Sequence, residues 1–277
     1  MDIRIVNTCN NKCLYCLEQS YRNEKEFIDL SNIINKLDNK NDKIITFYWW
    51  NPLLHPDLIN IIEYSKNNGY LSIWLLTNTF WISNYFINKL ILAWLTSIWI
   101  YFNCFDSKKH NLIVNWWIWL KELINNIKII KSTWINCKII IHINKQNINL
   151  IWRDIYILNK NFWVKEFEFI NYFPFDIPYD LNRSNLEYDE KKNRKNIDYI
   201  FKIINKYKLK CKFIKFPKSF FWDFMNYYDF ANWIERQIWE EDIVRLSSSK
   251  KPFCLLEKRC KNCFIKDKCE ILWILKD

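Results

Sequence analysis

Short apolar segments alternate with longer amphipathic segments along most of the chain, and this alternation predicts the order of strands and helices. In the longer segments hydrophobic residues recur every three or four positions, which is the pattern of one buried helix face. Three such faces are Leu58, Ile61, Ile62 and Ser65; Phe86, Ile87, Leu90 and Ile91; and Leu120, Leu123, Ile124, Ile127 and Ile130. The short segments are rich in β-branched and aromatic residues, which favours strands. They comprise residues 3–8, 44–49, 71–78, 97–103, 137–144 and 164–171.

Nearly continuous apolar strands that alternate with helices are typical of a parallel sheet covered by helices. We therefore expect an α/β fold, either a partial (β/α)6 barrel of parallel strands or an open doubly wound sheet. In both architectures the functional site lies at the carboxyl ends of the strands. Polar residues gather at these predicted ends, among them Cys9, Asn51, Asn78 and Asn103.

The pattern changes after residue 171. A further helix is expected around residues 197–207 and an additional strand at 210–217, and from about residue 218 the chain is aromatic-rich and ends in a group of cysteines. We divide the chain into a barrel domain, residues 1–215, and a small Cys-rich metal-binding appendage, residues 216–277. Because no low-complexity linker separates the two, we expect the appendage to pack onto the barrel.

Glycine is nearly missing from this chain, and tryptophan is abundant. The 277 residues include one Gly and 16 Trp, whereas ordinary usage predicts roughly 19 glycines. Gly69 stands where a helical pattern stops and a strand begins, the place where glycine tolerates a left-handed backbone. Trp94, Trp134 and Trp163 stand in the same context. We hypothesise that many tryptophans are glycines in the native protein, encoded by a codon that other organisms read as stop or Trp; the alternative is a truly Trp-rich protein.

Net charge and cysteine content narrow the class of protein. The net charge of +11 and pI of about 9.0 suit an anionic partner, but Lys and Arg form no compact block, so nucleic acid is not the favoured partner. The chain shows no secretory signal pattern and no uninterrupted apolar run long enough for a membrane span, which favours a cytoplasmic protein. Ten cysteines in such a chain favour metal binding over disulfides.

Three cysteines form a C-x3-C-x2-C motif directly after the first predicted strand. Cys9, Cys13 and Cys16 can hold three irons of a 4Fe–4S cube and leave the fourth iron open to an outside molecule. The alternatives are a zinc site without its fourth ligand and unrelated buried thiols.

This motif and two others resemble those of the radical S-adenosylmethionine (SAM) superfamily. That family carries C-x3-C-x-aromatic-C after strand one, where Tyr15 supplies the aromatic residue. It carries Gly-Gly-Glu-Pro after strand two and often Thr-Asn-Gly after strand three. The corresponding residues are Trp49, Trp50, Asn51 and Pro52, and then Thr77, Asn78 and Thr79. The resemblance covers roughly residues 1–171 and departs from the family where Asn51 replaces Glu and Thr79 replaces Gly.

The resemblance implies a function and a set of site residues. Cys9, Cys13 and Cys16 would bind a 4Fe–4S cluster whose open iron takes the amino and carboxylate groups of SAM. Reductive cleavage of SAM would give a 5′-deoxyadenosyl radical that takes hydrogen from a substrate, with a reductant such as a flavodoxin or ferredoxin as electron donor. The cofactor site would include Tyr15, Trp49, Trp50, Asn51, Pro52, Thr77, Asn78 and Asn103. If Trp49 and Trp50 are real, their indoles would fill the methionyl pocket.

A second group of cysteines lies near the carboxyl end of the chain. Its members, spaced C-x5-C-x2-C-x5-C, are Cys254, Cys260, Cys263 and Cys269. Four thiolates close a metal site, and the spacing resembles the SPASM and twitch modules of peptide-modifying radical SAM enzymes, although it is shorter. We expect one further 4Fe–4S cluster, with structural zinc or no metal as alternatives. Cys104, Cys137 and Cys211 are isolated and expected to be inert buried thiols.

The appendage is the only sequence feature that indicates a substrate. Its resemblance to peptide-modifying enzymes favours a peptide or protein side chain, while a small molecule or cofactor precursor and tRNA remain open. A non-catalytic zinc-binding or RNA-binding protein is the alternative from another class. No residue is singled out as a catalytic acid or base, and His55 is expected only to cap a helix start.

Overall fold

A parallel seven-stranded sheet forms the centre of the structure, a computed structural model that describes residues 1–16, 27–38, 42–48, 51–115, 119–171, 177–214, 216, 220 and 221. The strands follow one another in the sheet in the order of the sequence, and every neighbouring pair is parallel. They are β1 (Asp2–Arg4), β2 (Ile44–Tyr48), β3 (Ser72–Thr77), β4 (Ser97–Tyr101), β5 (Asn136–His142), β6 (Glu166–Ile170) and β7 (Lys210–Ile214). All six expected strands and the additional seventh are confirmed, as is the α/β fold of an open, partial barrel.

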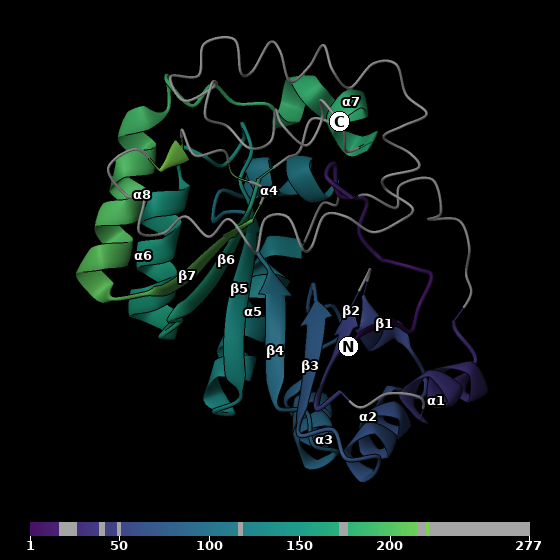
Figure 1. The fold of residues 1–277 in the computed structure, drawn as a ribbon. Coiled ribbons are helices and arrows are strands. Elements are labelled where there is room, and N and C mark those ends of the chain that lie inside the picture. Colours follow the sequence, from purple (N-terminus) through teal and green to yellow (C-terminus); the bar gives the residue numbers. More distant parts are fainter. Residues whose placement is uncertain are drawn as a thin grey trace, which may run out of the picture.

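Helices connect the strands and cover the convex face of the sheet (Figure 1). In chain order they are α1 (Leu30–Asp38), the short 3-10 helix η2 (Pro52–Leu54), α2 (Leu58–Asn67), α3 (Asn84–Leu92), α4 (Ser107–Val114), α5 (Trp119–Ser132), α6 (Ile151–Phe162), α7 (Ile177–Leu186) and α8 (Arg194–Tyr207). Helices α6 and α8 flank one side and α1 and α2 the other, while α4 and α7 lie beyond the carboxyl ends of the strands. None of the helices in the described ranges has the length and apolar character needed to cross a membrane.

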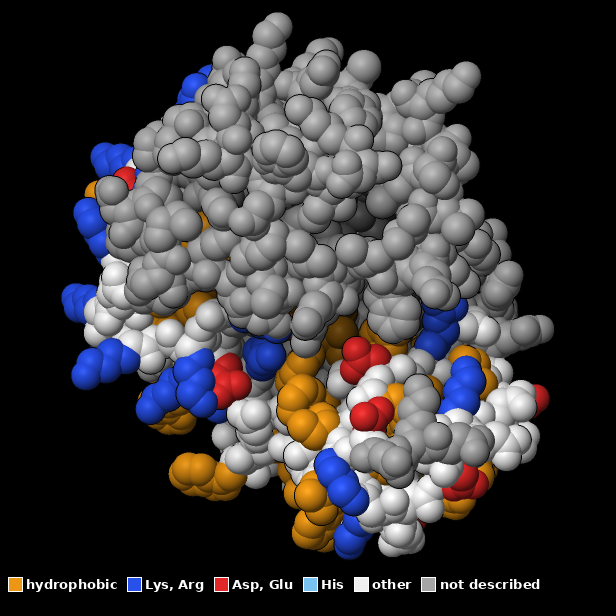
Figure 2. Space-filling view, viewed as in Figure 1, with side chains coloured by type: hydrophobic (Ala, Val, Ile, Leu, Met, Phe, Trp, Pro, Cys, Tyr) orange, Lys and Arg blue, Asp and Glu red, His pale blue; other side chains and the backbone are white. Residues whose placement is uncertain are grey.

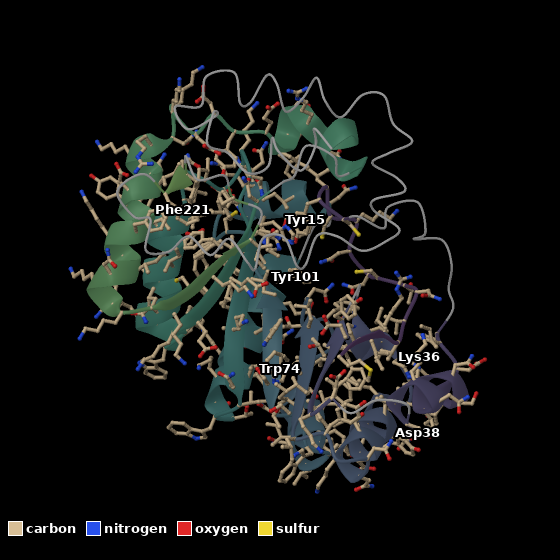
Figure 3. The ribbon with its side chains drawn as sticks, viewed as in Figure 1. Tyr15, Lys36, Asp38, Trp74, Tyr101 and Phe221 are labelled. Atoms are coloured by element: carbon tan, nitrogen blue, oxygen red, sulfur yellow. The ribbon has the colours of Figure 1, made fainter. Side chains whose placement is uncertain are left out.

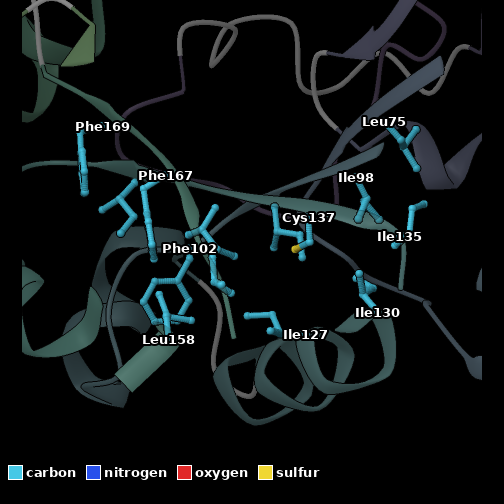
Figure 4. Packing of buried hydrophobic residues seen from close by; sticks show 14 of the residues in the cluster. Leu75, Ile98, Phe102, Ile127, Ile130, Ile135, Cys137, Leu158, Phe167 and Phe169 are labelled. Atoms are coloured by element: carbon cyan, nitrogen blue, oxygen red, sulfur yellow. The ribbon is translucent and has the colours of Figure 1, made fainter. Parts of the chain in front are cut away.

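The main hydrophobic core lies between the sheet and its helices. Isoleucine and phenylalanine side chains from the convex face of the strands meet Leu158 of α6 and Ile127 and Ile130 of α5 (Figure 4). The expected helix faces are confirmed, since Leu58, Ile61, Ile62 and Ser65 are the buried residues of α2. Phe216, Phe220 and Phe221 join the same core, whereas residues 222–277 of the expected appendage lie outside the described residues.

Several helix-to-strand turns at the amino edge of the sheet share one left-handed geometry. Gly69 and Trp94 both have φ 87°, Trp134 has φ 64° and Trp163 has φ 51°. At Gly69 and at Trp94 the N–H donates to the carbonyl three residues earlier, at 3.0 and 2.9 Å, and the following N–H reaches back five residues, the bonding of a Schellman turn. Trp94, Trp134 and Trp163 thus share the left-handed φ of Gly69, and Trp94 also shares its hydrogen bonding.

His55 precedes the start of α2 but is not its cap as expected, because the N-cap of that helix is Asp57; the His55 ring instead bonds to the turn around it. Its Nδ1 accepts the N–H of Asp57 at 3.0 Å, and its Nε2 lies 3.0 Å from the carbonyl oxygen of Ile28. The ring thus ties the start of this helix to the segment before α1.

Candidate functional site

Three half-buried cysteines occupy the loop that follows β1. These are Cys9, Cys13 and Cys16, and within the described residues no three His, Cys, Asp or Glu side chains converge as ligands of a single metal ion. A structural zinc site is normally closed by four ligands, whereas three thiolates can bind three irons of a 4Fe–4S cube. The three-thiol donor set therefore fits such a cluster.

Hydrogen bonds from α4 and α7 position the cysteine loop. The N–H groups of Lys12 and Leu14 donate to the carbonyl oxygens of Val114 and Ile113, at 3.1 and 2.9 Å. These are carbonyls of the last turn of α4, which have no partner within the helix itself. On the other side Asn182 of α7 donates its Nδ2 to the carbonyl oxygen of Leu14 at 2.9 Å.

Asparagine side chains join the carboxyl ends of β1, β2 and β3. The Oδ1 atom of Asn10 accepts Nδ2 of Asn51 at 3.1 Å and Nδ2 of Asn78 at 3.0 Å. Asn51, which is fully buried, also accepts the hydroxyl of Thr77 at 2.6 Å. Pro52 follows at the start of η2 and is buried as well. In this structure the amide of Asn51, after β2, therefore hydrogen-bonds to residues at the ends of both β1 and β3.

The turn after β3 has the backbone of a glycine turn. Thr79, at the position where the family often carries Gly, has φ 67°, a left-handed conformation that β-branched residues rarely adopt. Its N–H donates to Oγ1 of Thr77 at 2.9 Å, and its carbonyl accepts Nδ2 of Asn126 at 2.8 Å. The N–H of Phe80 donates to Oδ1 of Asn78 at 3.1 Å. These bonds hold the turn in place despite the unfavourable residue.

Asn103 offers an unused acceptor at the end of β4. The residue is buried, and its Oδ1 has no hydrogen-bond partner in the described part of the chain. Its carbonyl accepts Nδ2 of Asn147 at 3.1 Å, and the same Nδ2 also donates to the carbonyl of His142 at 2.8 Å. A buried amide oxygen without a donor calls for a ligand or water that supplies one.

Aromatic rings line the concave side of the sheet next to the cysteine loop (Figure 3). Tyr15 stacks on His142, with ring centroids 4.0 Å apart and an angle of 14° between the planes. The ring of Tyr101 lies 5.7 Å from that of His142. Burial raises the pKa of the Tyr101 hydroxyl, and the carboxylate of Glu168 raises it further, as do Cys16, Cys13 and Cys9 in smaller measure. Tyr101 is therefore a neutral phenol between the cysteine loop and the inner wall.

The inner wall also carries a largely buried ion pair. The ammonium of Lys138 lies 3.3 Å from the carboxylate of Glu168 and 3.8 Å from the centre of the Trp99 ring. Trp74 of β3 packs beside Trp99 at a centroid distance of 4.9 Å. Figure 2 shows apolar side chains on this face, with Lys and Arg at both flanks of its described part, interspersed with Asp and Glu.

Several of the residues expected from the sequence lie together in this site. Asn51, Thr77 and Asn78 share one hydrogen-bond network next to Cys9, and Tyr15 lies on the inner wall, whereas Trp49, Trp50 and the four carboxyl-terminal cysteines lie outside the described residues. Five further residues of the site were not predicted, because their residue type alone does not mark them: Asn10, Tyr101, Lys138, His142 and Glu168. Alternation along β4, β5 and β6 places the last four on the concave face, so strand parity offered a usable clue. Cys104 and Cys137 are buried as expected, and burial raises the pKa of each to about 12. Cys211 differs from the expectation because it is only half-buried, at the edge strand β7.

Comparison with solved structures supports the fold. SuiB of Streptococcus suis bound to S-adenosylmethionine is similar with a TM-score of 0.59 and 16% identity, over 76% of this chain and 49% of SuiB. Native anSMEcpe with bound AdoMet and Cp18Cys peptide gives 0.61 and 15%, over 76% and 62%. HydG, a maturase of the [FeFe]-hydrogenase, gives 0.57 and 10%, over 81% and 53%. The chain thus spans less than two thirds of each of these proteins, and identities this low show the fold alone.

Comparison of the sequence with protein families gives a more specific result. No curated protein matches the chain. The family described as the radical SAM superfamily matches residues 3–154, a segment that includes the cysteine loop and the turns after β2, β3 and β4. Because this match covers more than half of the chain, the protein belongs to the radical SAM superfamily of enzymes.

Proposed function

We propose that Cys9, Cys13 and Cys16 hold a 4Fe–4S cluster and that the chain cleaves SAM reductively. When bound, this pair of cofactors supplies a 5′-deoxyadenosyl radical that takes hydrogen from the substrate. The observation that carries the proposal is a loop of three half-buried cysteines, fixed by α4, at the same sheet edge as the unpartnered Oδ1 of Asn103. A flavodoxin or ferredoxin in the cytoplasm is the proposed electron donor.

The residues of the chain would bind and orient SAM. Oδ1 of Asn103 is an acceptor for a hydroxyl or ammonium group of SAM, and the rings of Tyr15 and His142 offer flat apolar faces for adenine. Thr77, Asn78, Asn51 and Pro52 shape the wall on the β2 and β3 side. Packing and burial on the concave side would exclude water and stray hydrogen donors from a radical.

Anaerobic reconstitution tests this function. We expect bound iron and acid-labile sulfide, and release of 5′-deoxyadenosine from SAM when a strong reductant is added. A chain that binds zinc but no iron would contradict the proposal and favour the non-catalytic zinc-binding alternative.

The proposed substrate is a peptide or protein side chain. SuiB has been solved bound to its precursor peptide SuiA, and anSMEcpe with the Cp18Cys peptide. The inner wall beside Tyr101 combines aromatic surface with one ammonium and one carboxylate, Lys138 and Glu168, groups that can accept an apolar side chain and hydrogen-bond a peptide amide. A short precursor-peptide gene next to the gene of this protein would supply the test substrate, and a mass change in that peptide would identify it. An unmodified peptide would favour a small molecule, cofactor precursor or tRNA.

We also propose that many of the tryptophans are glycines in the native protein, Trp49 and Trp50 first among them. The left-handed backbone of Trp94, Trp134 and Trp163 supports this, because only glycine adopts it without cost. At Trp49 and Trp50 the reason is access, since backbone groups that bind the methionyl end of SAM need an approach free of side chains. A version with glycine at all 16 positions should bind SAM, and the printed sequence should bind it weakly. Tryptophan at 49 and 50 in peptides from the native organism would refute the idea.

The carboxyl-terminal region, residues 216–277, is the proposed metal-binding appendage. Its four cysteines, Cys254, Cys260, Cys263 and Cys269, would bind a second 4Fe–4S cluster or one zinc ion. Metal analysis should find about eight irons per chain in the first case, and about four irons with one zinc in the second. Deletion of residues 250–277 should remove this second centre only, and an unchanged metal content would show that the site does not exist.

A further inference from the structure

Two N–H groups point at the sulfur of Cys9. The backbone N–H of Asn11 donates to Cys9 Sγ at 3.4 Å, and Nδ2 of Asn78 donates to the same sulfur at 3.8 Å. The first bond comes from within the cysteine loop. The second comes from β3, so it depends on the choice of residue 78 and can be removed by mutation.

Neighbouring bonds fix the orientation of the Asn78 amide. The N–H of Phe80 can only donate, so the atom that it meets at 3.1 Å must be the amide oxygen, Oδ1. The amide nitrogen therefore faces the other way, where one N–H meets Oδ1 of Asn10 at 3.0 Å and the second meets Cys9 Sγ. Asn78 is buried, so water does not compete for these donors.

The turn itself does not require the nitrogen. An Asx turn uses only the side-chain oxygen of residue 78, which Asp or Ser would also provide. The β3 end needs no amide either, because Thr77 and Asn51 are already bonded to each other. The amide nitrogen of Asn78 therefore donates only to Asn10 and Cys9 among the described residues.

We infer that Asn78 is a positioning residue that sets the reduction potential of the cluster through Cys9. This inference rests on the proposed function, in which the Cys9 thiol of this structure stands for a cluster-bound thiolate. Hydrogen bonds to ligand sulfur withdraw charge from the cluster and stabilise its reduced, more negative form. Asn78 therefore makes the cluster easier to reduce.

A redox titration of the reconstituted protein without SAM, followed by the electron paramagnetic resonance signal of the reduced cluster, tests this role. Asn78→Ser removes the donor to Cys9, and Asn78→Asp replaces it with a negatively charged oxygen. We expect the midpoint potential to fall in Asn78→Ser and to fall further in Asn78→Asp. If Asn78→Asp assembles no cluster, Asn78→Ser alone decides.

The matched control is Asn126→Leu. Asn126 is a buried asparagine that donates to the carbonyl of Thr79 in the same turn and makes no bond to Cys9. Its loss should leave the midpoint potential unchanged. An equal shift in Asn126→Leu, or no shift in Asn78→Ser, would overturn the inference. A wild-type chain that binds no iron would overturn the proposed function itself, and this inference with it.

Discussion

The two edges of the sheet use their unusual residues in opposite ways. At the amino edge, Trp134 and Trp163 hold left-handed turns while 96% and 73% of their surfaces are exposed. At the carboxyl edge the left-handed Thr79 is fully buried and has hydrogen-bond partners on its N–H and its carbonyl. Trp134 and Trp163 at the amino edge are thus largely in solvent, whereas Thr79 at the carboxyl edge belongs to a hydrogen-bonded network.

We expect substitutions at the amino edge to change stability, and substitutions at the carboxyl edge to change function. A turn that bonds only to its own helix can change residue without affecting distant groups, so its cost appears only in the free energy of unfolding. At the carboxyl edge, Asn10, Asn51 and Asn78 share bonds with one another and with Cys9. Changes there should alter the chemistry of the cysteine loop. In parallel barrels the carboxyl edge is where functional residues lie, and the opposite edge serves stability.

The largest effect is expected from replacing the cysteines of the loop at the carboxyl edge. Replacing Cys9, Cys13 and Cys16 together with Ala should reduce 5′-deoxyadenosine formation to background, because the cluster loses all its ligands. The midpoint of thermal unfolding of the metal-free protein should change little, since backbone bonds of Lys12 and Leu14 to α4 hold the loop. Product analysis and circular dichroism of the same samples measure both.

The matched control for this triple variant removes other thiols. Cys104 and Cys137 lie in the core, where burial raises the thiol pKa to about 12. The variants Cys104→Ala and Cys137→Ala should retain SAM cleavage. Undiminished 5′-deoxyadenosine from the triple variant would exclude these three cysteines as the cluster ligands.

Much of the fold followed from the sequence, because apolar periodicity reports local burial. The helix faces and strands, including the strand that became β7, emerged in this way. The carboxyl edge was only partly predictable. The cysteine motif marked its loop, but the partners of Asn10 and Asn78 lie far apart in the chain, at separations of 41 to 69 residues. No local pattern reports such pairings, since asparagine at a strand end is also ordinary turn chemistry.

His110 should have an effect of intermediate size, on the pH dependence of the unfolding free energy. It is fully buried in α4, the helix that holds the cysteine loop, and neither ring nitrogen has a partner within the described chain. Burial lowers its pKa to about 4. The unfolded chain binds this proton near pH 6.5, so between these values the unfolded state binds more protons, and stability falls as the pH falls.

His110→Leu should remove this pH dependence. The wild type should lose up to about 3 kcal/mol of unfolding free energy between pH 6.5 and pH 4 through this residue, beyond whatever the variant loses. Urea unfolding at both pH values measures the difference. Parallel losses in the two proteins would show that His110 does not titrate on unfolding.

The smallest effects test the amino edge. Trp134→Gly and Trp163→Gly should each raise the unfolding free energy by about 0.5–1 kcal/mol, because relief of the left-handed backbone outweighs the extra entropy of glycine in the unfolded chain. Trp152 in the first turn of α6 packs against the core and against Tyr199, so Trp152→Gly should instead lower stability by about 1 kcal/mol or more.

The reverse exchange completes the comparison. A Cβ at Gly69 would meet no atom within 4 Å, so φ 87° is the only obstacle to a side chain there. Gly69→Ala should therefore lower the unfolding free energy by roughly 0.5–1 kcal/mol, about as much as Trp134→Gly or Trp163→Gly raises it. Denaturant unfolding of all four variants decides. Equal losses at positions 134, 152 and 163 would mean that the indoles at the amino edge stabilise their turns, and the proposed exchange of glycine for tryptophan would lose its physical basis.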